Sequence, residues 1–372
     1  MKTFFASFQK RNSSVELARF LAIGFIIIGH CCVFSGLYPN QAKDPFGHGI
    51  FFFHDMLSQV GNGLFISILA FYLFFERSAA KPTWKRIISL YLPCLFYTWV
   101  LFGIFIAQGN VPNDTVLRQT HWPILYNNYW FVRAYLIFLL VYPLYYKMLS
   151  VLTVKQHGFL AAVFFITIMA IGRHGDKLWG FIGAMEFLCF FTVIGFFKRV
   201  HPAKPKRWYI WVPLALLCIA AVFGYVMMCE FVEPMKPYLS WMNNCVSLLL
   251  FPTCIVLFYA FLSLPEFHCG PLNYLGHCTF GIYLINGNTC NIQVWMGSYT
   301  QFLAKDHGVA LGILFAWLVY MGIGLAAEAV RLPLFEIGRI GIVGAWNHTF
   351  GKKIAARKAK KEAVSDIDSS GN

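Results

Sequence analysis

About ten apolar segments, most of them long enough to cross a lipid bilayer, dominate this chain of 372 residues. A helix needs about 20 mostly apolar residues to span the hydrocarbon core. Only 12% of the residues are charged and 58% are hydrophobic. So few charges could not cover the surface of a soluble enzyme, and disorder requires low hydrophobicity. The sequence therefore predicts an all-α integral membrane protein with about ten transmembrane helices.

The expected spans lie at roughly 15–35, 59–75, 86–107, 129–149, 158–172, 178–197, 208–229, 240–263, 275–297 and 308–332. The first is too long for a cleaved signal peptide and carries Glu16 and Arg19 at its start. The stretch FGHGIFFFHDM falls in an expected outer loop, 36–58. We interpret it as an aromatic belt at the membrane interface, with a re-entrant segment as the alternative.

Lysine and arginine gather on one side of the expected membrane. With the N-terminus inside, 22 of the 30 fall in cytoplasmic segments and six in outer loops, while Arg19 and Arg133 lie within spans. The positive-inside rule then puts both termini in the cytoplasm. The net charge of +14 marks cytoplasmic loops that can meet anionic lipids, so we expect membrane lipids and no nucleic acid as partners.

Residues 1–335 are expected to form one polytopic membrane domain, and 336–372 a basic, partly disordered cytoplasmic segment. The 11 cysteines show neither repeated CxxC nor Cys/His ligand spacing. Several lie in apolar runs, where free cysteine packs as a small hydrophobe. We therefore predict no metal site and no disulfide.

The first span carries three ionisable residues, which are functional candidates because charges within a membrane are costly. Arg19 and His30 are separated by three turns plus about 20°, so they share one face, roughly 16 Å apart along the axis. Glu16 can pair with Arg19 at a spacing of three. Either Arg19 meets a cytoplasmic anion while His30 performs proton chemistry, or the three only anchor and pack the helix. The physics alone leaves both interpretations open.

Residues 15–30, VELARFLAIGFIIIGH, resemble the opening span of the membrane-bound acyltransferase 3 family, whose signature is Arg, ten residues, then His, often with an acidic residue three positions before the Arg. The resemblance continues in order through LAFYLFFERSAAKPTWKRIISLYLP, YWFVRAYLIFLLVYPL and LGHCTFGIYLIN, over roughly residues 10–335. The chain departs from the family's pattern at Ala70-Phe71, where Ser-Gly is common. It also has Ser89 for the second Arg of Arg-x-x-Arg, and Asn286 where the late motif commonly has His.

The resemblance implies a multi-pass enzyme of the inner cell membrane. Such O-acyltransferases take an acyl group, with acetyl from cytoplasmic acetyl-CoA as the expected one, and place it on a hydroxyl of an envelope polysaccharide or its lipid-linked precursor. Acyl-CoA and a glycan or lipid-linked glycan are then the substrates, and no bound cofactor is expected.

The resemblance also assigns roles to residues. His30 would be the general base on the acceptor hydroxyl or a transient acyl carrier, Arg19 would hold the donor, and Glu16 would orient Arg19. The expected donor-phosphate contacts are Lys81, Lys85 and Arg86. The expected acceptor contacts are Trp130 and Arg133, near the outer end of the fourth span, with an anchor at the membrane interface as the alternative.

A transporter or flippase for a glycan or lipid precursor is the alternative, since intramembrane charges suit it too. No internal repeat supports that alternative. A non-catalytic scaffold would leave Arg19 and His30 without a purpose. Glu186 lies mid-span with no partner that the sequence names, and Glu328 with Arg331 is expected to be a local ion pair.

Overall fold

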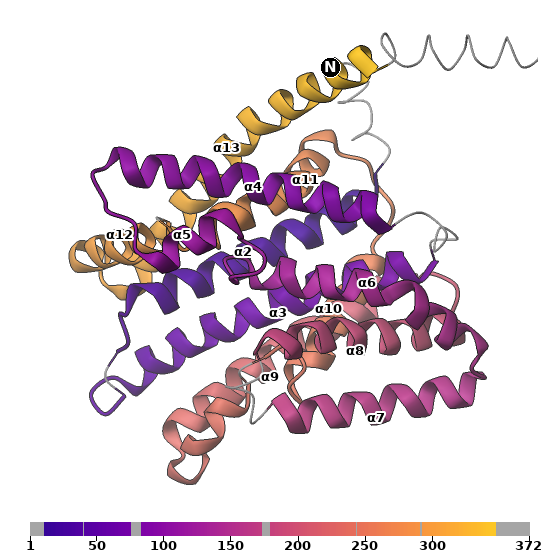
Figure 1. Cartoon of the computed structure of the whole chain (residues 1–372). Coiled ribbons are helices and arrows are strands. Elements are labelled where there is room, and N and C mark those ends of the chain that lie inside the picture. The colour runs from indigo at the N-terminus through magenta and orange to yellow at the C-terminus, as the bar shows by residue number, and fades with distance from the viewer. Residues whose placement is uncertain are drawn as a thin grey trace, which may run out of the picture.

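The structure is a computed structural model that describes residues 11–39, 41–75, 83–172, 179–242, 244–290 and 292–346. It is 83% helical, and the described part contains no strand, so the all-α prediction is confirmed. The elements in Figure 1 are α2 (Ser13–Ser35), α3 (Pro45–Phe75), α4 (Thr83–Ala107), α5 (Asp114–His121), α6 (Trp130–Val151), α7 (Val154–Gly172), α8 (Trp179–Val200), α9 (Trp208–Phe231), the 3-10 helix η2 (Glu233–Met242), α10 (Leu250–Ser263), α11 (Gly270–Asn286), α12 (Ile292–His307) and α13 (Val309–Trp346).

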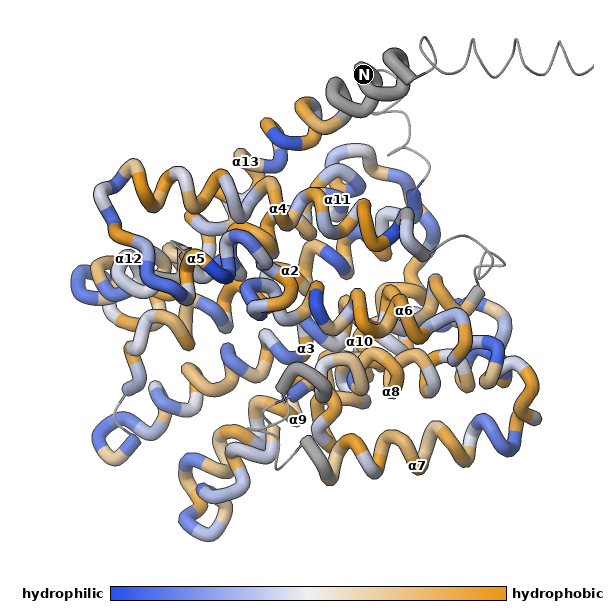
Figure 2. The backbone as a smooth tube through the Cα atoms, in the orientation of Figure 1, coloured by the Kyte–Doolittle hydropathy of each residue, from blue (hydrophilic) through white to orange (hydrophobic). Residues whose placement is uncertain are grey.

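Six helices are long and apolar enough to cross a membrane: α2, α3, α4, α6, α9 and α13. Two further apolar helices, α7 and α10, are shorter. Hydrophobic residues run along the helices, and hydrophilic ones are concentrated at helix ends and connections (Figure 2). The protein is therefore a multi-pass membrane protein.

Helix α2 lies at the centre of the bundle and packs on α3, α11, α12 and α13. Its start is fixed by Asn12, whose side chain accepts a hydrogen bond from Ser14 N at 3.1 Å. Gly36 ends it in the left-handed conformation, with φ 63°. A Cβ at Gly61 of α3 would overlap the carbonyl oxygen of Ala22. The α2–α3 approach is therefore close, as small residues allow between membrane helices.

Helices α2 and α11 run in the same direction from adjacent starting points. Ser13 N donates to Phe267 O at 3.0 Å, and Ser13 Oγ donates to Asn273 Oδ1 at 2.7 Å. One turn further on, Gly276 of α11 packs directly against Glu16 of α2. This parallel pairing brings the late part of the sequence against the acidic and basic residues of the first span.

The predicted loop at 36–58 is wrong for most of its length. Helix α3 begins at Pro45, a residue favoured in the first helical turn, so the FGHGIFFFHDM stretch is helical. One of its histidines is fixed there, because His48 Nδ1 lies 2.8 Å from Glu230 Oε1 of α9. The first expected span, by contrast, agrees with α2 to within two residues.

Two predicted spans are wrong in extent because asparagine side chains form turns with the backbone. The expected helix 275–297 is interrupted after Asn286, where Asn288 Oδ1 accepts from Cys290 N at 2.8 Å. The expected helix 240–263 starts only at Leu250, after a turn in which Asn244 Oδ1 accepts from Val246 N at 3.1 Å.

Helix α13 continues beyond residue 335 as far as Trp346, through the boundary predicted between the membrane domain and the C-terminal segment. Residues 347–372 lie outside the described part of the chain. The division into 1–335 and 336–372 remains a prediction.

Candidate active site

The predicted ion pair between Glu16 and Arg19 is present at the start of α2. Arg19 Nη1 donates to Glu16 Oε1 at 2.9 Å, and Arg11 Nη1 lies 3.3 Å from the same oxygen. Glu16 is 4% exposed, and a Cβ at Gly276 would overlap its other oxygen. The carboxylate is therefore held between its arginines and the backbone of α11.

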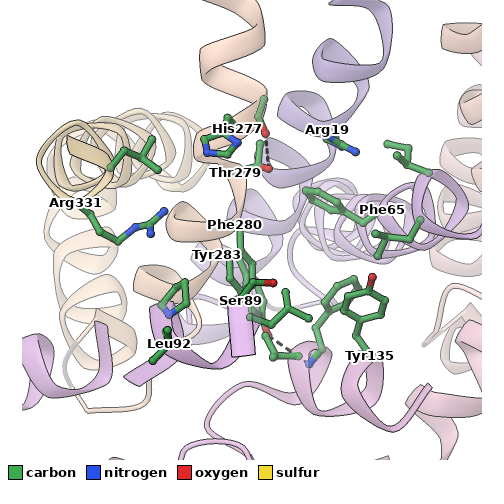
Figure 3. A pocket seen from close by; sticks show the side chains of 18 of the residues that line it. Arg19, Phe65, Ser89, Leu92, Tyr135, His277, Thr279, Phe280, Tyr283 and Arg331 are labelled. Carbon is green, nitrogen blue, oxygen red and sulfur yellow. Dashed lines mark hydrogen bonds between the residues drawn. The ribbon is translucent and has the colours of Figure 1, made fainter. Parts of the chain in front are cut away.

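A cavity of about 640 Å³, here called the main cavity, opens beside this pair (Figure 3). It is lined by residues of six helices, which are Arg19, Ile26, Phe65, Ile68, Leu69, Ser89, Leu90, Leu92, Pro93, Phe131, Val132, Tyr135, Gly276, His277, Thr279, Phe280, Tyr283, Arg331, Leu332 and Phe335. This volume is in the range of small-molecule sites, which are mostly apolar with a few placed polar groups.

A second, smaller cavity of about 310 Å³ lies at the N-terminal end of α2. This N-terminal pocket is lined by Arg11, Asn12, Val15, Glu16, Arg19 and Tyr72. Arg19 therefore lines both cavities.

The ionisable groups of the main cavity come from three helices. Arg19 belongs to α2, His277 to α11 and Arg331 to α13, and in Figure 3 His277 lies between the two arginines. Most of the remaining wall is aliphatic or aromatic. The cavity can thus receive an anionic group at its charged part and an apolar body in the rest. No group of His, Cys, Asp or Glu side chains in the described residues is arranged to hold a metal ion.

Arg331 is part of the predicted local pair, but it also faces the main cavity. Its Nε and Nη2 donate to Glu328 at 2.6 and 2.7 Å, and Tyr97 Oη donates to the same carboxylate. A Cβ at Gly281 would overlap Glu328. The sequence did not identify Arg331 and His277 as site residues, because spacing along α13 or α11 does not reveal which other helices these side chains face.

His30 is half-buried, with its ring 5.3 Å from that of Phe34. Its Nδ1 is buried and makes no hydrogen bond to the described residues. On α2 the main cavity reaches Ile26, one helical turn or about 6 Å before His30. Arg19 and His30 thus lie on one continuous helix as predicted, but the structure brings only Arg19 into the cavity.

The predicted donor contacts lie at the start of α4 or before it. Lys81 lies outside the described residues, and so does the side chain of Lys85. Arg86 is half-buried in the first turn of α4, where its carbonyl accepts from Ser89 Oγ at 2.8 Å. Ser89, rather than Arg86, lines the main cavity.

The predicted acceptor contacts are not brought to the main cavity. Trp130 packs toward α8, where a Cβ at Gly183 would lie 3.7 Å from its ring. Arg133, one turn along α6, is half-buried. The α6 residues that do line the cavity are Phe131, Val132 and Tyr135.

Two other embedded residues have defined surroundings. Glu186, whose partner could not be named from the sequence, is 5% exposed and hydrogen-bonded to the thiol of Cys245. Asn286 is fully buried, with Nδ2 donating to Ile282 O at 2.8 Å and Oδ1 without a partner among the described residues.

The chain matches a family model described as an acyltransferase domain over residues 12–330. Neither a curated protein nor a solved structure matches it significantly. The matched range runs from the N-cap of α2 into α13 and includes Arg19, His30, His277 and Glu328. Because the match covers most of the chain, this multi-pass membrane protein belongs to the acyltransferase 3 family and is an acyltransferase.

Proposed function

We propose that this acyltransferase moves an acetyl group from cytoplasmic acetyl-CoA to a hydroxyl of a cell-envelope polysaccharide or its lipid-linked precursor, in the inner cell membrane. The presence of Arg19 in the lining of both the N-terminal pocket and the main cavity carries the proposal. A donor that enters with its phosphates in the N-terminal pocket meets a guanidinium where its acyl arm passes into the main cavity. Arginine suits this role because its planar fork binds phosphate strongly.

The proposal includes ten spans with both termini in the cytoplasm. The six long helices, with α7, α8, α10 and α11, make ten. This topology sends α2 and α11 across the membrane in the same direction, as their parallel packing requires. The N-terminal pocket then opens to the cytoplasm, where acetyl-CoA is made and where the lysines and arginines are concentrated.

In the proposed reaction, the thioester lies at the end of the main cavity nearest Ile26, one turn from His30. His30 takes the proton of the acceptor hydroxyl as its oxygen bonds to the acetyl carbonyl carbon. The carbon–sulfur bond then breaks, and the imidazolium returns the proton to the departing CoA sulfur. The buried His30 Nδ1, which has no partner among the described residues, is consistent with this role. Direct transfer of the acetyl group through His30 is the alternative route.

The remaining predicted contacts keep their places in the proposal. Lys81, Lys85 and Arg86 lie on the cytoplasmic side, where they would contact the donor phosphates. Trp130 and Arg133 lie in the first turn of α6, where they would contact the glycan outside the main cavity.

The test uses membranes that contain the protein, supplied with labelled acetyl-CoA and surface glycan. His30→Ala is expected to lower glycan labelling at least about 100-fold, the usual effect of losing a general base. The matched control is His121→Ala, on the exposed helix α5. Unchanged labelling by His30→Ala would refute the His30 mechanism. If wild-type membranes consume no acetyl-CoA while a glycan lipid crosses the bilayer, the protein is a transporter instead.

A further inference from the structure

The main cavity contains a second guanidinium that the proposed reaction does not use. Arg331 lies on α13, and its side chain is only 8% exposed. Nε and Nη2 bind Glu328, and the guanidinium is also hydrogen-bonded to Tyr97, so about three of its five N–H groups have protein partners. Because Arg331 also lines the cavity, other N–H groups remain for a ligand there.

The surroundings of Arg331 hold it rigidly in place. Glu328 is fully buried, is braced by Tyr97 and packs on Gly281 of α11. Replacing a buried ion pair by apolar residues is often neutral or stabilising, so stability alone does not explain such a pair. Ionisable residues inside membrane proteins are functional candidates by default.

The local charge balance favours an anion. Three arginines, Arg11, Arg19 and Arg331, lie within electrostatic range of His277. Among the described ion pairs, these three arginines share two carboxylates, Glu16 and Glu328. The imidazole of His277 lies between the guanidiniums of α2 and α13 (Figure 3).

We propose that Arg19 and Arg331 together bind the diphosphate group of an amphiphilic substrate, whose apolar part occupies the rest of the main cavity. Two arginines on different helices offer two forks, and a diphosphate presents two phosphoryl groups to them. An acyl-CoA carries such a group, and so does a lipid diphosphate of the kind that carries glycans. The inference rests on the proposed function for both candidate ligands.

The test measures binding to the full-length protein in lipid nanodiscs. The probes are acetyl-CoA and farnesyl diphosphate, each compared with a phosphate-free counterpart, acetyl-pantetheine and farnesol. Arg331→Gln is expected to weaken binding of at least one diphosphate about tenfold or more, because hydrogen bonds to charged groups are strong. It should change binding of the matching phosphate-free probe less than about twofold, and Arg331→Lys should restore part of the loss because the charge remains.

The probe whose binding depends on Arg331 identifies the source of the diphosphate. Arg118→Gln, on the exposed helix α5, is the control for lost positive charge. Equal loss for a diphosphate and its phosphate-free counterpart, or unchanged binding of both diphosphates, would overturn the proposal. If Arg331→Gln does not fold, Arg331→Lys decides by the same comparison, since it loses the fork and keeps the charge.

Binding and turnover separate this inference from the proposed function. A wild-type protein that binds a diphosphate through Arg331 but transfers no acetyl group supports the inference and refutes the function. If the wild-type protein transfers acetyl and the Arg331→Gln variant binds both diphosphates normally, the result supports the proposed function and refutes the inference.

Discussion

The two glutamate–arginine pairs beside the main cavity share their local geometry and differ in their surroundings. Each pair has a spacing of three, each carboxylate packs on a glycine of α11, and each arginine lines the cavity. The side chains of Glu16 and Arg19 are 5% and 27% exposed, whereas those of Glu328 and Arg331 are 0% and 8% exposed. Spacing along one helix therefore identifies the pair, while the neighbouring helices decide how strongly it is buried.

The largest expected difference comes from removing each carboxylate charge. Glu328→Gln leaves a buried guanidinium without its counter-charge and is expected to cost about 3–5 kcal/mol of unfolding free energy. Glu16→Gln is expected to cost about 1 kcal/mol or less, because water reaches Arg19. Denaturant unfolding of both variants in one detergent measures the difference. Equal losses would show that burial does not separate the two pairs.

The next largest losses of stability are expected from substitutions at the glycines of α11. Gly281→Ala and Gly276→Ala each place a Cβ into a glutamate side chain, and overpacking of this kind costs about 1–3 kcal/mol. At Gly276 the obstruction also includes the Cα of Glu16 at 3.0 Å, so α11 must move away from α2. Gly322→Ala on α13, with no atom within 4 Å, is the control. Thermal unfolding should show a lower midpoint than wild type for both α11 variants and an unchanged midpoint for Gly322→Ala. A wild-type midpoint for either α11 variant would contradict the close packing.

The features that depend on residues close together in the sequence, or on their order along it, agree with the predictions. The start of α2 follows from Asn12, and the pair of Glu16 with Arg19 follows from a spacing of three within one helix. The family follows from residue order along the chain. Each of these depends on residues that are close together in the sequence or on their order along it.

Features that depend on distant contacts were not predictable. The break after Asn286 is stabilised by Thr289, whose N–H donates to Asn128 Oδ1 at 3.0 Å, 161 residues earlier in the chain. Arg331 faces the cavity because α13 packs on both α2 and α11, an arrangement that spacing along α13 does not contain. The packing of the Trp130 ring against α8 could not be read from the sequence either, and its acceptor contact stays a prediction.

A smaller loss of stability is expected from removing the Tyr97 hydroxyl, which donates a hydrogen bond to Glu328 of the more deeply buried pair. Tyr97→Phe removes the hydroxyl that donates to Glu328 but keeps the ring, whose centre lies 5.8 Å from the guanidinium carbon of Arg331. The loss should be about 1.5 kcal/mol, the lower end for bonds to charged groups, because Arg331 still binds both carboxylate oxygens. In denaturant unfolding, Tyr97→Phe combined with Glu328→Gln should cost less than the sum of the two single changes. Strict additivity would show that the hydroxyl does not act through the carboxylate.

The smallest effect belongs to a third, exposed pair in the connecting loops, Lys204 with Glu266, whose side chains are 47% and 57% exposed. The ammonium of Lys204 holds the pKa of the Glu266 carboxyl below its ordinary value. A depressed folded-state pKa contributes stability above the unfolded pKa, about 4.3, and this stability is lost as the pH falls through the folded value. Since water and salt screen an exposed pair, Lys204→Ala should unfold like wild type at pH 7 in about 0.15 M salt. Any destabilisation should appear only at low salt and should be lost as the pH falls through the lowered pKa of Glu266. A salt-insensitive loss as large as that of Glu16→Gln would break the ranking of the three pairs by burial.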